Sequence, residues 1–175
     1  MKQPVPNKIY RILVINPGST STKLSVYENE EEVVGQSYRH SRSELDAAGS
    51  VSKQKTMRAN YAYNMLKEHG ISLDSLDAVV GRGGLVQPID SGTYLISERM
   101  LADLISSTAE VHASSLGGII AYEIAAQAGV PGYVVDPIVV DELEQVAKLT
   151  GFPGIERRSV FHALNQKAVA RCCAA

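Results

Sequence analysis

The stretch that most constrains this chain is residues 10–28, where a short aliphatic run stops at Asn16-Pro17-Gly18. Proline fixes φ and glycine permits positive φ, so this tripeptide predicts that a buried strand ends here in a turn. Four hydroxyl residues follow at 19–22, and then Lys23. The alternation after the turn predicts a second strand, with aliphatic residues on one face and Lys23 on the other.

The residue types in this turn indicate a phosphate site. Backbone N–H groups and hydroxyls donate to phosphate oxygens, and a lysine supplies a point charge. A Walker A loop is excluded, because no second glycine precedes the lysine and no helix is expected after it. An ordinary polar hairpin is the alternative. The candidate phosphate-binding residues are Gly18, Ser19, Thr20, Ser21 and Lys23.

The length of 175 residues suggests one domain, or half of a two-domain protein. A net charge of −2 gives no electrostatic reason to expect a nucleic acid or an acidic membrane surface as partner. No apolar run reaches the roughly eighteen residues of a membrane span, and the apolar run near the N-terminus is too short for a signal peptide. The two cysteines, Cys172 and Cys173, are adjacent, which suits a structural disulfide poorly. We therefore expect a reduced, cytoplasmic protein.

The rest of the chain predicts alternating strands and helices. Strands are expected at 33–38, 78–81 and 133–137, and an irregular hairpin at 85–96. Helices are expected at 52–69, 98–107, 116–127, 142–149 and from 160 to about 171. In the first of these helices, Met57, Tyr61 and Met65 mark the expected core face. An antiparallel opening hairpin followed by strand–helix–strand passages predicts an α/β domain with a mixed sheet and flanking helices, of the ribonuclease H-like (actin-like) plan.

Three predicted strands end in a polar residue beside a glycine or proline: Asn16, Arg82 and Asp136. Because ligands bind at the carboxyl ends of parallel strands, these side chains should share one edge. Arg82 suits a carboxylate or phosphate, since a guanidinium donates two parallel hydrogen bonds. Asp136 suits Mg²⁺ held through water. His112 precedes a helix whose N-terminus favours an anion, and His162 lies at another helix start. Solvated or capping roles are the alternative for each.

Five segments of the chain, in this order, resemble the acetokinase family, and in particular its members that act on butyrate and branched-chain acids. They lie at residues 16–23, 79–84, 112–117, 134–136 and 157–166. The resemblance implies an actin-like ATPase fold and a Mg²⁺-dependent kinase. Such a kinase uses ATP to convert a short-chain carboxylate reversibly into an acyl phosphate. It also implies a homo-oligomer for the full-length parent, with no nucleic acid or membrane partner.

The resemblance also implies roles for single residues. Asn16, with Ser19, Ser21 and Lys23, would belong to the phosphate and metal loop. Arg82 would hold the carboxylate and the transferring phosphoryl group, and Asp136 would organise the metal or substrate. His112 and His162 would stabilise the phosphoryl group in transfer.

Acetokinases have two actin-like domains, and the resemblance ends within the first. We therefore expect a leader at 1–9, the N-terminal kinase domain at 10–160, and a helix at 161–175 leading towards an absent second domain. This division predicts that the isolated chain is inactive. A non-catalytic nucleotide- or anion-binding module of the same fold is the alternative, as is an acetate or propionate kinase.

Overall fold

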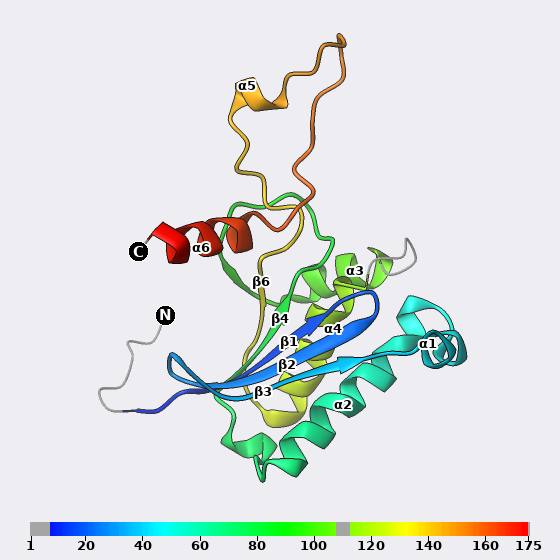
Figure 1. Ribbon diagram of the computed structural model, residues 1–175, viewed down its shortest axis with the longest axis vertical. Helices are drawn as coiled ribbons and strands as arrows, with labels where there is room; N and C mark the ends of the chain where they lie inside the picture. Colours follow the sequence, from blue (N-terminus) through cyan, green and yellow to red (C-terminus); the bar gives the residue numbers. More distant parts are fainter. Residues whose placement is uncertain (1–7, 108–112, 175) are drawn as a thin grey trace.

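The protein, described here from a computed structural model, is built on a mixed six-stranded sheet in the order β3-β2-β1-β4-β6-β5 (Figure 1). The structure describes residues 8–107 and 113–174, so most of the expected leader lies outside the described residues. Strands β1 and β4 and strands β4 and β6 pair in parallel, and the remaining neighbours are antiparallel. The strands are β1 (Arg11–Pro17), β2 (Ser21–Glu28), β3 (Glu31–Arg39), β4 (Ala78–Arg82), β5 (Thr93–Leu95) and β6 (Gly132–Val135).

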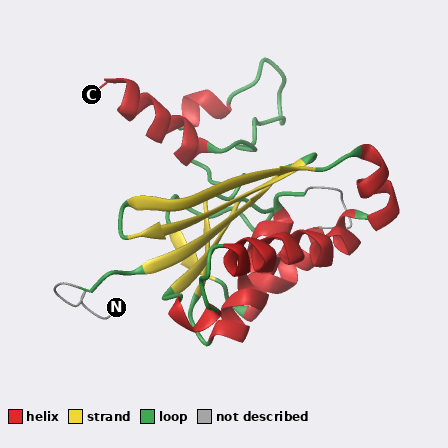
Figure 2. Ribbon diagram, turned by 60° about the horizontal axis from the view of Figure 1, so that its bottom comes forward, coloured by secondary structure: helices red, strands yellow, loops and turns green. Residues whose placement is uncertain are grey.

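Four helices lie together on one face of this sheet (Figure 2). They are α1 (Arg42–Ala48), α2 (Gln54–Glu68), α3 (Glu98–Ser107) and α4 (Ser115–Ala128), with single 3₁₀ turns at η1 (Val51–Lys53) and η2 (Leu73–Ser75). The opening hairpin shows why the core lies on this side. Leu13 and Ile15 of β1 and Leu24 and Val26 of β2 are fully buried, because alternate residues of a strand face the same way. The intervening, more polar residues face away from the helices.

The chain leaves the sheet after β6. The segment 137–161 extends away from the sheet and carries the short helix α5 (Gln145–Lys148); helix α6 (Ala163–Ala174) then begins beside the end of β6 (Figure 1). None of the helices that the structure describes is long and apolar enough to cross a membrane.

Two glycines allow helix α4 to lie directly on strand β4. A Cβ atom added to Gly81 would lie 2.3 Å from the backbone carbon and oxygen of Gly117. A Cβ added to Gly117 would in turn lie 2.7 Å from the backbone oxygen of Arg82. This close approach brings the first turn of α4 against the strand that ends in Arg82.

Replacing Gly81 with alanine should therefore lower the free energy of unfolding by about 3 kcal/mol or more, since both contacting atoms belong to backbone that cannot rotate away. Urea denaturation followed by circular dichroism measures the change. Gly151→Ala is the matched control, because a Cβ at Gly151 meets no atom within 4 Å. Equal unfolding midpoints for the two variants would contradict this account of the packing.

The structure corrects several expected boundaries. Pro17 is a strand residue that pairs with Thr22, so the turn is confined to residues 18–20. Helix α1 lies in the stretch 39–51, which has no clear sequence pattern. Within 85–96 only β5 is a strand, and it pairs with β6 rather than with a neighbour in the same stretch. The helix expected at 142–149 is confined to α5, and the last helix begins at Ala163, after the Phe161 amide donates to the carbonyl of Ile138.

Candidate active site

The polar side chains at the ends of the parallel strands meet at one edge of the sheet, as the sequence predicts. Arg82 donates from Nη2 to Asp136 Oδ2 at 3.1 Å and from Nη1 to Asn16 Oδ1 at 3.4 Å. The three residues stand at the ends of the adjacent strands β1, β4 and β6. Arg82 is thus held in one orientation between two acceptors that come from its two neighbouring strands.

Asp136 organises this edge. It has a left-handed backbone, with φ of 53°, and its side chain is 5% exposed. Its Oδ1 accepts the Leu164 amide at 3.1 Å, which joins the start of α6 to the end of β6. The Nδ1 atom of His162 lies 3.0 Å from both the carbonyl oxygen and Oδ2 of Asp136. Both of these atoms are acceptors, so Nδ1 carries the proton and Nε2 faces away from Asp136.

Lys23 completes a row that runs across four neighbouring elements. It lies directly opposite Asn16 in the β1–β2 register and is exposed on the same face. A hollow of about 680 Å³ opens on this face, away from the core. Its lining residues are Val14, Asn16, Lys23, Ser25, Tyr27, Glu32, Gly35, Gln36, Ser37 and Arg82. Lys23 and Arg82 bring two cations to this face, where the carboxylates of Asp136 and Glu32 also lie, and both cations present N–H donors that an anion can accept.

The turn itself differs in part from the expected phosphate cradle. Ser19 and Thr20 are exposed at its tip and Ser21 is half-buried. The Gly18 amide is already used, since it donates to the Ser21 carbonyl at 2.8 Å. Gly18 therefore shapes the turn without offering a free donor there. Of the four hydroxyl residues, Thr22 points the other way: it is fully buried and contacts two side chains behind the turn.

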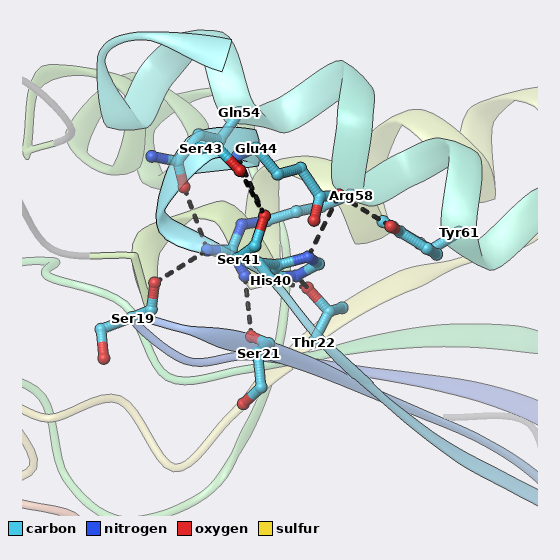
Figure 3. Close-up of polar contacts among 10 residues, drawn as sticks. All are labelled: Ser19, Ser21, Thr22, His40, Ser41, Ser43, Glu44, Gln54, Arg58 and Tyr61. Atoms are coloured by element: carbon cyan, nitrogen blue, oxygen red, sulfur yellow. Dashed lines mark hydrogen bonds and ion pairs between the residues drawn. The ribbon is translucent and has the colours of Figure 1, made fainter. Parts of the chain in front are cut away.

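Those two side chains, Arg58 of α2 and His40 at the end of β3, are absent from the sequence-based site (Figure 3). Arg58 is completely buried, with a relative exposure of 0%. The acceptors of its hydrogen bonds are neutral oxygens rather than carboxylates. The sequence signal that could have indicated the burial of Arg58 is its helical spacing from buried neighbours. Gln54, Arg58, Ala62 and Leu66 follow one another at intervals of four, and all are buried. The expected core face is displaced by one position, since Met57 and Tyr61 are only half-buried and Met65 alone is buried.

The buried His40 makes stability depend on pH. Its Nε2 lies 2.8 Å from Thr22 Oγ1, while Arg58 and the Tyr61 ring face it from α2 and Glu44 from α1. Burial lowers its pKa below the ordinary value of 6.5, and the charge of Arg58 lowers it further, against the opposing effect of Glu44. The unfolded chain therefore binds a proton more readily than the folded one as pH falls below about 6.5.

We expect the unfolding temperature to be constant near pH 8 and to fall as the pH drops from about 6.5 towards 5.5. Thermal unfolding at several pH values measures this, and His40→Gln, which has no titrating group, should flatten the profile in that window. An unchanged slope in the variant would show that other groups cause the pH dependence.

The remaining predicted residues fit less directly. His112 lies outside the described residues, so its role stays a prediction. No cluster of three or more His, Cys, Asp or Glu residues that could hold a metal occurs in the described part of the chain. Both oxygens of Asp136 are engaged, and Asn16 Oδ1 faces Arg82. The donor set therefore suits a magnesium ion that keeps its water and is carried by phosphates, rather than an ion ligated directly by the protein.

Comparison with known proteins shows which enzymes the chain is similar to. The chain is 52% identical over 163 residues to Butyrate kinase 1 and 50% identical over 162 residues to Butyrate kinase 2, both from Clostridium acetobutylicum. The chain is therefore similar to butyrate kinases over nearly its whole length. Each match covers 93% of the chain and 46% of the relative, so the chain spans about half the length of the butyrate kinases it matches. No family model matches the chain.

Solved structures of acetokinase-like enzymes share the fold. Acetate kinase from Porphyromonas gingivalis matches with a TM-score of 0.62 at 15% identity, covering 94% of this chain and 48% of the other. A propionate kinase from Francisella tularensis matches with a TM-score of 0.62 at 16% identity, covering 95% and 48%. At this identity the likeness establishes the ribonuclease H-like (actin-like) architecture expected from the sequence.

Proposed function

We propose that this chain carries the phosphoryl-transfer edge of a carboxylate kinase, which uses ATP to convert a short-chain carboxylate such as butyrate reversibly into its acyl phosphate. The observation that carries the proposal is the row of Lys23, Asn16, Arg82, Asp136 and His162 along one sheet edge. The two butyrate kinases that are 52% and 50% identical to this chain support the same chemistry.

The reaction needs charge and position more than covalent chemistry. A carboxylate oxygen attacks the γ-phosphorus of ATP, the new O–P bond forms, and the bond to the β–γ bridging oxygen breaks, so that ADP leaves with the electron pair. Arg82 would hold the carboxylate and balance the charge on the equatorial phosphoryl oxygens. Asn16 and Asp136 fix its guanidinium beforehand, so the donors need not reorganise when the charge develops.

The neighbouring groups would hold ATP. The exposed hydroxyls of Ser19 and Thr20, with Ser21 and Lys23, would contact the phosphates. His162, oriented by Asp136, would donate from Nε2 to the moving phosphoryl group when its ring is protonated. Mg²⁺ carried by the phosphates would neutralise their charge, with Asn16 and Asp136 facing it through water. A role for His112, a cytoplasmic location and a homo-oligomer of the longer protein stay predictions.

Trapping with hydroxylamine tests the proposal, because acyl phosphates yield coloured hydroxamates. The chain would be assayed alone and also joined to the part of Butyrate kinase 1 that its match leaves uncovered. Mg-ATP would be supplied with carboxylates of two to five carbons. We expect hydroxamate from at least the joined protein, with the highest kcat/KM for a four-carbon acid. A maximum at two or three carbons would make it an acetate or propionate kinase.

The control is Butyrate kinase 1 itself in the same assay. Folded proteins that bind Mg-ATP but form no hydroxamate, alone or joined, would overturn the proposal in favour of a nucleotide-binding module. Activity in the joined protein but not in the chain alone would show that transfer needs the added segment. Activity in neither would show that the chain does not support transfer.

A further inference from the structure

The tip of the opening hairpin is held from behind by a buried arginine. Arg58 of α2 donates from Nη1 to the Ser21 carbonyl at 2.8 Å and from Nη2 to the Ser19 carbonyl at 3.4 Å (Figure 3). The intervening carbonyl, that of Thr20, accepts the backbone amide of His40 at 2.9 Å. Three successive carbonyls of the turn are thus engaged by groups that come from β3 and α2.

This carbonyl arrangement fixes which groups the turn offers to a ligand. In a planar trans peptide the N–H points opposite to the carbonyl of the preceding residue. The Ser19 carbonyl is bound by Arg58 on the helix-covered side, so the Thr20 amide points to the other side. The Thr20 carbonyl points towards His40, which follows β3, so the Ser21 amide points away from β3. The exposed hydroxyls of Ser19 and Thr20 stand at the same tip. The turn therefore has three carbonyls covered, while the Thr20 amide and the exposed hydroxyls of Ser19 and Thr20 remain as donors, which is the polarity that a phosphate requires.

The turn does not adopt this shape through its own sequence preference. The Gly18 amide donates to the Ser21 carbonyl, so Ser19 and Thr20 are the two central residues of the turn. Two-residue hairpin turns favour types I′ and II′, which need positive φ at one or both central residues. Neither Ser19 nor Thr20 has positive φ. Hydrogen bonds from outside the hairpin therefore stabilise the conformation of this turn, and Arg58 donates two of them.

The positive charge of Arg58 is not neutralised by a carboxylate among the described residues that contact it. Among the described residues no carboxylate forms a salt bridge with it, and its remaining acceptors are the Thr22 hydroxyl at 2.8 Å and the Gln54 amide oxygen at 3.0 Å. Glu44, the acid that acts on it electrostatically, accepts a hydrogen bond from Tyr61. A buried cation without a carboxylate partner is costly, and an anion bound at the turn would compensate it.

We propose that Arg58 is a positioning residue for phosphate binding: it holds the carbonyls at the turn between β1 and β2, residues 18–20, and at the first residue of β2, and it places a buried positive charge beneath them. This inference rests on the proposed function. In this proposal a completely buried residue, Arg58, contributes to ATP binding by shaping the turn that contacts the phosphates.

Three variants separate this role from simple stability. Arg58→Met removes the charge and all four hydrogen bonds at similar length, and Arg58→Lys keeps the charge. Lys55→Met, three residues earlier on α2, removes a cation that pairs with Glu123 away from the turn. Each would be assayed at a temperature where circular dichroism shows it folded, and if Arg58→Met does not fold, Arg58→Lys carries the test.

The kinetic readout compares the change in the KM for Mg-ATP with the changes in kcat and in the KM for the carboxylate. Arg58→Met should raise the KM for ATP by about tenfold to a hundredfold, the range that charge-assisted hydrogen bonds convert to, and leave the carboxylate KM unchanged. Arg58→Lys should fall between it and the wild type, and Lys55→Met should match the wild type. A loss of kcat in proportion to the folded fraction, with KM for ATP unchanged, would overturn the proposal.

A second readout needs no activity. Hydrogen exchange at the amides of residues 19–22, measured without ligand, should be faster in Arg58→Met than in Lys55→Met once both are normalised to global stability. Equal exchange would refute the bracing role even if the kinase proposal stands. Absent hydroxamate formation by the wild type, with exchange altered as expected, would instead refute the kinase proposal and leave the bracing role supported.

Discussion

Replacing Arg82 with alanine is expected to lower the rate of acyl phosphate formation by about 10³-fold or more, the range found when arginines that stabilise phosphoryl transfer are removed. The guanidinium is held by Asn16 and Asp136, so no neighbouring cation can take its place without moving. Lys23 lies two strands away and provides one point charge rather than a planar pair of donors. Hydroxamate trapping at saturating ATP and butyrate, in whichever protein is active, measures the loss.

Arg82→Lys refines this prediction. It keeps the charge but not the fork, so a rate close to that of Arg82→Ala would assign the effect to two-point geometry rather than to charge. Arg42→Ala is the matched control, since its side chain is 95% exposed on α1. Full activity in Arg82→Ala would mean that this arginine is a solvated strand end and that the proposed mechanism is wrong.

Replacing Asp136 with asparagine should cost both activity and stability. Asparagine tolerates the left-handed backbone and can still accept the Leu164 amide, but it no longer neutralises Arg82 or orients His162 by charge. A small displacement of positioned groups lowers rates by about a hundredfold, and we expect a loss of at least that size. Removing one partner of a buried pair costs about 3 kcal/mol, less here because Arg82 is partly exposed.

Asp141→Asn is the control for this variant, because Asp141 pairs with Lys148 in the extended segment away from the sheet edge. Rate and urea midpoint should both change in Asp136→Asn and neither should change much in Asp141→Asn. A normal rate with a lowered midpoint would show that Asp136 is a structural link between β6 and α6 and has no part in the chemistry.

The sequence predicted the arrangement of the fold and of the sheet edge because both follow from local signals. Aliphatic runs stopped by glycine or proline marked β1, β4 and β6, and parallel pairing then required Asn16, Arg82 and Asp136 to converge. The Gly83 that follows Arg82 has φ of 86°, which is the backbone such a stop requires. The roles of these residues in catalysis stay predictions.

What the sequence did not predict depends on contacts between distant segments. Arg58 and Gln54 occupy a buried helix face, where charge and amide polarity normally indicate solvent. Arg58 donates to Gln54 Oε1 on its own helix and to two carbonyls and the Thr22 hydroxyl of a turn far away in the sequence. Thr22 looks like a loop hydroxyl until β2 pairing turns it inward. Within the stretch 137–161, Ile138 and Val140 are buried, but Val146, Leu149 and Phe152 are exposed, so the part around α5 has no core face.

In the proposed reaction, the sheet edge of this chain supports transfer of the γ-phosphoryl group of ATP to a carboxylate. The most direct test supplies butyrate labelled with ¹⁸O in its carboxylate and follows the products by ³¹P NMR and mass spectrometry, in the chain alone and in the joined protein. The proposed transfer should give ADP and an acyl phosphate whose bridging oxygen, now bonded to phosphorus, carries ¹⁸O. An acyl adenylate whose bridging oxygen carries ¹⁸O, formed with release of pyrophosphate, would mean attack at the α-phosphorus. That result, or no consumption of ATP by either protein while Butyrate kinase 1 is active, would contradict it.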